Sequence, residues 1–185
     1  YSSDRQASAE AKLLGSLLSH KRGELGQAEL LRELETLSAI WRGDNIELMT
    51  LNRMVQIYAD TGRYVDSLSA AKTATRMQPN SELSRQSQDA ASALFAQLFL
   101  SPKGEDMKPV DALAMFYEYR ELTPIGRRGD EMIRRLAERL ASIDLLDQAA
   151  ELLQYQVDKR LEGAARAQVA ARLAMVYLTN RKPDR

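Results

Sequence analysis

The sequence predicts an all-α fold of about nine helices, arranged as antiparallel pairs joined by short loops. Apolar residues recur every three or four positions in one segment after another, which is the spacing of a helix with one buried face. The five prolines and nine glycines fall mainly between these segments, where they end helices. No segment alternates β-branched and aromatic residues with polar ones as a strand does.

The first expected pair of helices occupies residues 4–40. Its first helix runs from Asp4 to His20, and four apolar residues at helical spacing predict its buried face: Ala7, Ala11, Leu14 and Leu18. Gly23 interrupts the pattern. The second helix covers 25–40, and its apolar stripe is Ala28, Leu31, Leu34 and Leu37.

The second expected pair occupies residues 45–78. Asn45 is a suitable N-cap for its first helix, since an amide oxygen can accept from the free N–H groups of the first turn. Gly62 ends that helix, and the next runs from Tyr64 to Met77 before Pro79.

The third expected pair, 81–123, contains the main interruption of the helical pattern. Ser81 is a good capping residue for a long helix that ends near Leu100. Residues 101–108 read SPKGEDMK and predict a loop, after which Pro109 is tolerated in a first helical turn. We expect this helix to continue almost to Pro124.

The last expected elements are the pair 126–161, with helices at 130–142 and 146–160, and an unpaired final helix at 164–179. The chain starts at Tyr1 without a methionine and stops shortly after this helix. We therefore expect a piece of a longer protein.

The composition excludes several classes of function. Lys+Arg and Asp+Glu both number 26, whereas nucleic-acid binders carry excess positive charge, so no nucleic acid is expected as the main partner. The chain has no cysteine and a single histidine, His20, which makes a disulfide or a zinc or iron site improbable. No apolar run reaches the length of a membrane span.

Catalytic patterns are absent as well. No nucleophile elbow, metalloprotease, phosphate-binding or dinucleotide-binding fingerprint occurs. Asp144 and Asp147 form a carboxylate pair, but they flank a corner between helices, and nothing there suggests the burial that acid–base chemistry requires. His20 stands beside Lys21 and Arg22 at a helix end, where it can meet terminal carbonyls. We expect neither an enzyme nor a cofactor.

Residues 48–81, LMTLNRMVQIYADTGRYVDSLSAAKTATRMQPNS, carry a family resemblance. They resemble the tetratricopeptide repeat (TPR), with Tyr58 in the first helix, Gly62 at the turn and Pro79 at the end. Small residues at Ser67 and Ala71 let the two helices approach closely. This is the clearest copy in the chain.

Later copies are degenerate. The second keeps the spacing of Ala112, Phe116 and Pro124, and in the third Leu140 and Ala149 stand nine residues apart, as Tyr58 and Ser67 do in the first copy. A fourth begins near residue 170. The resemblance implies one TPR-like domain over 1–185, a right-handed α-α superhelix, similar to parts of long bacterial TPR proteins. It leaves the bacterial cytoplasm and periplasm open, and we prefer the periplasm.

The resemblance implies a scaffold that binds a partner protein or peptide, because TPR arrays usually do so on a concave face built from first helices. The resemblance assigns partner binding to positions expected to be exposed on three helices: Met49, Asn52, Gln56 and Asp60; Glu131, Arg134, Arg135 and Glu138; Gln168, Arg172 and Met175. Some TPR domains clamp a terminal carboxylate with Lys and Asn where this chain has Asn52 and Gln56. That clamp is therefore not predicted.

Five arginines make the densest charged cluster: Arg127, Arg128, Arg134, Arg135 and Arg139. Glu131 with Arg135, and Arg134 with Glu138, have the spacing of helical ion pairs. We favour a salt-bridged solvated face over a basic lip that attracts an acidic peptide. The nearby aromatic residues are expected in the core, although an exposed Phe99 or Tyr117 would serve as an anchor for a partner: Phe95, Phe99, Phe116, Tyr117 and Tyr119.

Two other functions stay open. The arginine cluster suits a helical-repeat nucleic-acid binder, which stacks bases at regular repeat positions. The final helix has no partner helix, and its stripe of Val169, Leu173 and Val176 is expected to be uncovered. A second copy could cover that stripe, which makes self-association the other alternative.

Overall fold

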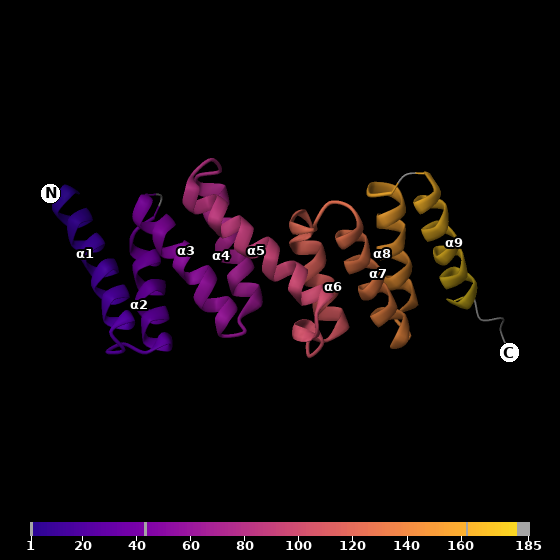
Figure 1. Ribbon diagram of the computed structural model, residues 1–185, viewed down its shortest axis with the longest axis horizontal. Coiled ribbons are helices and arrows are strands. Elements are labelled where there is room, and N and C mark those ends of the chain that lie inside the picture. Colours follow the sequence, from indigo (N-terminus) through magenta and orange to yellow (C-terminus); the bar gives the residue numbers. More distant parts are fainter. Residues whose placement is uncertain (1, 43, 162, 181–185) are drawn as a thin grey trace. The chain divides into compact units, whose positions relative to one another are not determined.

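The computed structural model describes residues 2–42, 44–161 and 163–180. Within these ranges the chain forms nine α-helices, two 3-10 helices and no strand, so the predicted all-α class is confirmed (Figure 1). The α-helices are α1 Ser2–Lys21, α2 Gln27–Ile40, α3 Asn45–Asp60, α4 Tyr64–Met77, α5 Glu82–Leu100, α6 Pro109–Glu118, α7 Arg127–Ser142, α8 Leu146–Lys159 and α9 Gly163–Asn180. The 3-10 helices are η1 Pro102–Gly104 and η2 Arg120–Leu122.

The contacts divide the chain into two compact units, Tyr1–Leu94 (unit 1) and Phe95–Arg185 (unit 2), with the boundary inside α5. Most neighbouring helices along the chain pack on one another within each unit, an arrangement compatible with a helical solenoid. The prediction of one domain over residues 1–185 stays a prediction.

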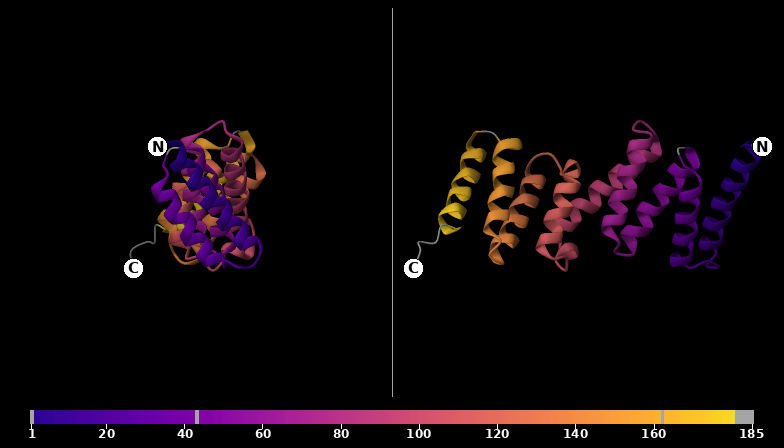
Figure 2. Two further views of the ribbon diagram at one scale, coloured as in Figure 1. Left: turned by 90° about the vertical axis from the view of Figure 1, so that its left-hand side faces the viewer. Right: turned by 180° about the vertical axis from the view of Figure 1, so that it is seen from behind.

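Unit 1 is built from successive helix contacts of α1 with α2, α2 with α3, and α3 with α4 (Figures 1 and 2). A polar network fixes three of these helices at one end. The Tyr58 hydroxyl donates to Glu35 Oε1 at 2.7 Å, and the Arg63 guanidinium lies 4.6 Å from the Tyr58 ring centre. Arg63 Nε also donates to Asp66 Oδ2 at 2.9 Å. Burial and the hydrogen bond to Glu35 raise the Tyr58 pKa, so this residue stays a neutral donor.

Small residues bring α3 and α4 close together, as the sequence predicted. Ser67 is fully buried and its hydroxyl donates to the Val55 carbonyl at 2.7 Å. Ala71 and Ala74 are also buried on the same helix, α4. Between the two helices Gly62 has φ of +78°, a conformation that favours glycine because it has no Cβ.

The start of α5 is capped and tied to α4 through hydroxyl groups. Ser81 Oγ accepts from the Ser84 backbone N–H at 3.1 Å, which confirms the predicted cap. Ser84 is buried, and its own hydroxyl donates to the Ala74 carbonyl at 2.9 Å. The buried Ser84 hydroxyl therefore has a partner, as burial of a polar group requires.

Unit 2 contains an aromatic core contributed by α5 and α6, and its helices α7, α8 and α9 lie side by side in sequence order (Figure 2). Phe95, Phe99 and Phe116 are buried, and their ring centres lie 4.9–6.2 Å apart. Tyr119 is buried too, whereas Tyr117 is half-buried. The core prediction is confirmed for the three phenylalanines and Tyr119, and Phe99 is not an exposed anchor.

A close approach of backbone to backbone fixes the start of α7. Arg160 donates to the Pro124 carbonyl at 2.8 Å and to Asp130 Oδ1 at 3.3 Å. Gly129 faces this contact: a Cβ on it would lie under 3.0 Å from both the Pro124 oxygen and the Arg160 guanidinium. Only glycine fits there, and the helix begins at Arg127, three residues before the predicted start.

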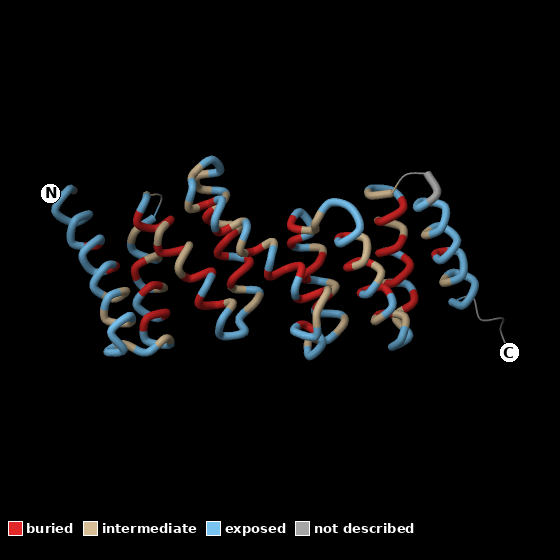
Figure 3. Tube along the Cα trace, in the orientation of Figure 1, coloured by how far each residue is buried: buried red, intermediate tan, exposed pale blue. Residues whose placement is uncertain are grey.

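The prediction for the buried face of α1 was wrong. Ala7, Ala11, Leu14 and Leu18 are exposed, and the buried residues of this helix are Ala9 and Leu13 (Figure 3). The helix carries apolar residues on two opposite faces, and contacts with α2 and α3 decide which face is covered. The periodicity of the apolar residues alone does not show which of the two faces is buried.

Two helix ends also differ from the prediction. The N-cap of α3 is Asp44, whose Oδ1 accepts from the N–H groups of Ile46 at 2.9 Å and Glu47 at 3.1 Å, and Asn45 is already helical. Helix α6 ends at Glu118, since the η2 turn and an extended Thr123 precede Pro124.

Candidate partner-binding site

The exposed face of α7 carries a continuous charge network. Arg134 Nε donates to Glu131 Oε2 at 2.8 Å and its Nη1 donates to Glu138 Oε1 at 2.6 Å, while Nη2 donates to Glu131 Oε1. Arg135 Nε donates to Glu131 Oε1 at 3.1 Å. Both predicted ion pairs of this helix are therefore confirmed. They follow from the i,i+4 spacing, which places these side chains on one face.

The network changes the titration of its members. The hydrogen bond from Arg134, with a smaller contribution from Arg135, lowers the pKa of Glu131 from its usual 4.5 to about 2. The two glutamates in turn raise the pKa of Arg134. Glu131 therefore remains ionised throughout the physiological range, and the Arg134 charge is neutralised on both sides.

Two arginines of α7 reach beyond their own helix. Arg135 Nη1 donates to the Leu100 carbonyl at 2.9 Å, in the last turn of α5, where helix carbonyls have no partner within the helix. Arg139 Nη2 donates to the Met107 carbonyl at 2.6 Å. These bonds hold α7 against the end of α5 and against the loop 101–108.

Between these elements lies a cleft of about 400 Å³. Its lining combines three arginines, two glutamates, two serines and two buried apolar side chains: Arg134, Arg135, Arg139, Glu105, Glu138, Ser101, Ser142, Leu98 and Phe99. One wall is fixed because Gly104 packs directly against the Leu98 carbonyl, with no room for a Cβ.

The side chain best placed to hold a ligand in this cleft is Arg139. It forms no ion pair within the described part of the chain, and its one hydrogen bond there leaves most of its five N–H groups available. Arg139 is half-buried beside the apolar floor, where a charge–charge contact is less screened than on the open surface. Arg134, in contrast, is already paired twice.

Sequence reasoning assigned Arg134, Arg135 and Glu138 to the site, and the structure brings these three together along one cleft. It included Arg139 in the arginine cluster but did not select it as an individual site residue. A signal was available, because the residues three and four positions away are Arg135, Leu136, Ser142 and Ile143, none of them acidic. An arginine with no carboxylate at helical spacing forms no ion pair on its own helix, so its charge is available to a different partner.

The expected site residues of α3 lie in unit 1. Asn52 is half-buried, and its Nδ2 donates to the Leu83 carbonyl at 3.2 Å and to Ser87 Oγ at 3.1 Å, which holds α3 against α5. Gln56 and Asp60 are exposed, and Met49 is half-buried. The Asn52 amide N–H groups thus serve the fold, whereas Gln56 and Asp60 remain accessible.

The expected site residues of α9 are all exposed: Gln168, Arg172 and Met175. The apolar stripe that was expected to be uncovered packs on α8 instead. Leu173 is buried, and Val169 and Val176 are half-buried. The prediction of an uncovered stripe at these three residues is therefore wrong, and the exposed apolar residues of α9 include Met175 and Leu178.

His20 lies in the last turn of α1 and makes a local contact with the backbone. His20 Nδ1 lies 2.9 Å from the Leu25 carbonyl oxygen, in the loop between α1 and α2, so its contact is with a loop carbonyl and not with a terminal carbonyl of its own helix. Within residues 2–42, 44–161 and 163–180, no three His, Cys, Asp or Glu side chains are placed to hold a metal ion. No helix in the same ranges has both the length and the apolar character needed to cross a bilayer.

Comparison of the chain with models of protein families finds no match, and comparison with curated proteins finds none either. The functional interpretation therefore rests on the geometry of the cleft and on the charges around it.

Proposed function

We propose that this chain is a non-catalytic, TPR-like helical-repeat module that binds a segment of a partner protein in the cleft between α5 and α7. The observation that carries the proposal is the half-buried Arg139, which has no carboxylate partner within the described chain and lies beside an apolar floor of Leu98 and Phe99. A carboxylate next to an apolar side chain complements these groups.

The placement of the cleft supports this proposal. It lies between α5 and α7, the first helices of two successive pairs, which is where the TPR resemblance expects a partner. Its lining offers arginine N–H donors, serine hydroxyls and apolar surface, the mixture that peptide-binding sites use for affinity and orientation.

A nucleic-acid partner has less support. Two of the three arginines in the cleft pair with Glu131 and Glu138 on the same helix, so they are not free to neutralise phosphates. The balance of 26 basic and 26 acidic residues points in the same direction.

The proposal is tested with a peptide array of roughly twelve-residue sequences that vary one acidic and one apolar position, probed with the labelled chain at low and at physiological salt. We expect acidic–apolar peptides to bind more tightly than their amide-substituted counterparts. Arg139→Gln should weaken the binding by about tenfold, and Arg139→Lys, which keeps the charge, by less.

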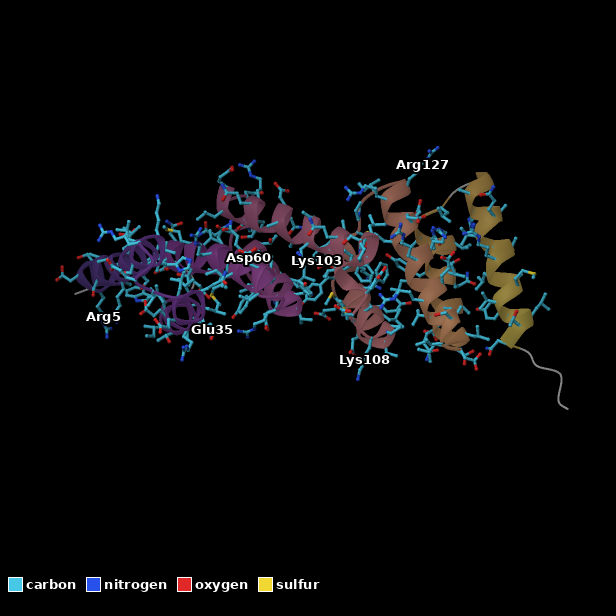
Figure 4. All side chains as sticks on the ribbon, turned by 60° about the horizontal axis from the view of Figure 1, so that its bottom comes forward. Arg5, Glu35, Asp60, Lys103, Lys108 and Arg127 are labelled. Atoms are coloured by element: carbon cyan, nitrogen blue, oxygen red, sulfur yellow. The ribbon has the colours of Figure 1, made fainter. Side chains whose placement is uncertain are left out.

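Arg127→Gln is the matched control, because Arg127 lies in the same helix, outside the cleft, with its side chain extending away from the ribbon (Figure 4). Its substitution should leave binding unchanged. Equal effects of the Arg139 and Arg127 substitutions, or no preference for acidic peptides at low salt, would show that the cleft is not the binding site.

A further inference from the structure

Helix α1 has a second apolar face that no other part of the described chain covers. Its buried residues, Ala9 and Leu13, lie on the side packed against α2 and α3. On the opposite side Leu14 and Leu18 are 51% and 52% exposed, and most of α1 is exposed in Figure 3. Two half-exposed leucines one turn apart form a contact surface rather than an isolated apolar residue.

This exposed face follows a heptad pattern from one end of the helix to the other. Its residues alternate steps of three and four, and all six are exposed: Asp4, Ala7, Ala11, Leu14, Leu18 and Lys21. That spacing is the seam of an antiparallel or parallel helix pair, in which side chains of one helix fit between those of the other. We call these six residues the α1 seam.

The α1 seam is complementary to itself when it is read in the opposite direction. In an antiparallel pair centred between residues 11 and 14, Leu14 of one copy faces Ala11 of the other, and Leu18 faces Ala7. Each large side chain thus meets a small one, which lets two helices approach closely. The same register places Asp4 opposite Lys21 at both ends.

The charges at the two ends are available for such a pair. Asp4 and Lys21 are exposed, and neither forms an ion pair within the described residues. The symmetric arrangement uses every seam residue twice and closes after two copies, as in most homo-oligomers.

We propose that two copies of this chain associate through the α1 seam as an antiparallel helix pair. This dimer is independent of the partner-binding cleft in unit 2. Because one pair of 20-residue helices gives an interface at the small end of the stable range, the dissociation constant is expected on the order of 10–100 µM.

Helix α9 fits the α1 seam less well, although it also has exposed apolar residues at the same spacing: Ala167, Ala171, Ala174 and Leu178. Its described residues include two arginines and no Asp or Glu, so it offers no carboxylate to Lys21. Charge complementarity therefore assigns the second copy of α1 to this surface.

The proposal is tested by sedimentation equilibrium of the chain from roughly 1 to 200 µM, a range that spans the expected dissociation constant. A monomer–dimer equilibrium is expected. The double substitution Leu14→Glu with Leu18→Glu should raise the dissociation constant by more than about tenfold, since it places four carboxylates in the seam. Leu178→Glu on α9 is the control and should leave it unchanged.

A mixing experiment tests the register. Lys21→Glu alone places two acidic residues opposite each other at both ends, and Asp4→Lys alone places two lysines there, so each variant should dimerise more weakly than the unmodified chain. Mixed in equal amounts, the two variants restore an opposite-charge pair at both ends. The mixture should therefore dimerise more tightly than either variant alone.

All these positions are exposed, so circular dichroism should show unchanged helix content in every variant. A monomer at all concentrations would overturn the proposal, as would a dimer that survives the double substitution. Loss of the dimer in Leu178→Glu would assign the contact to α9 instead. A mixture that dimerises no better than its components would refute the antiparallel register.

Discussion

Substituting Gly129 by alanine is expected to destabilise unit 2, although in most helix interiors the same change stabilises by about 0.5–1 kcal/mol. The added methyl group would lie under 3.0 Å from the Pro124 carbonyl oxygen and from the Arg160 guanidinium, and at 3.0 Å from the Thr123 methyl group. One of these neighbours must shift. The arginine can move only by giving up its 2.8 Å hydrogen bond to the Pro124 carbonyl.

The magnitude follows from two costs. Overpacking a close contact costs about 1–3 kcal/mol, and the loss of the hydrogen bond to the half-buried Pro124 carbonyl costs about 0.5–1.5 kcal/mol. The higher helix propensity of alanine offsets less than about 1 kcal/mol of this destabilisation. The net loss is therefore roughly 1–4 kcal/mol.

Gly15→Ala is the matched control. Gly15 lies within α1, is exposed, and a Cβ there would meet nothing within 4 Å, so its substitution should stabilise the chain by about 0.5–1 kcal/mol. Urea unfolding followed by circular dichroism measures both variants, and hydrogen exchange locates the change. A Gly129→Ala variant as stable as the unmodified chain would refute the steric argument.

Two further predictions concern helix α3 and the α7 network. Asp44→Ala should lower the free energy of unfolding in urea by about 1 kcal/mol, because it removes the acceptor for two backbone N–H groups. Asn45→Ala should lower it by less, and the opposite order would indicate that Asn45 is the N-cap. The Glu131 pKa, lowered to about 2 in the folded chain, means that its stabilising contribution is present above its usual 4.5 and is lost as pH falls from there toward 2. Because the Glu131–Arg134 pair is more than a third exposed, that contribution is at most about 1 kcal/mol. A carbon-13 NMR titration of Glu131 measures the pKa, and a midpoint near 4.5 would contradict the network.

The sequence predicted the number and order of the helices well because their boundaries depend on local chemistry. Gly62 and Pro79 end helices through their own backbone preferences, and Ser81 caps α5 with its own hydroxyl. The ion pairs of α7 also depend only on spacing within one helix. Each of these features needs no knowledge of the tertiary contacts.

Features that depend on contacts between helices could not be predicted in the same way. The α1 face that is buried is chosen by α2 and α3, since both faces of α1 contain apolar residues. The early start of α7 depends on the contact of Gly129 with Pro124 and Arg160, which lie five residues before it and 31 after it in the sequence. The role of Asn52 as a tie to α5 is likewise a tertiary contact.

The cleft could be predicted only in part from the sequence. Spacing alone placed Arg134, Arg135 and Glu138 on one face, but the second wall comes from the end of α5 and the loop 101–108. Which of the three arginines has no carboxylate partner depends on which of them form ion pairs with the glutamates. The distribution of these pairs leaves Arg139 without a carboxylate partner in the described chain, which is why we propose it as the binding residue.

The central claim is that Arg139 pairs with a carboxylate of the partner segment, and a double-mutant cycle tests it most directly. Isothermal titration calorimetry would measure the tightest acidic array peptide and its amide counterpart against the unmodified chain and Arg139→Gln. The account predicts a coupling free energy of about 1.5 kcal/mol between Arg139 and the peptide carboxylate. Additive effects, with a coupling below roughly 0.3 kcal/mol, would contradict it.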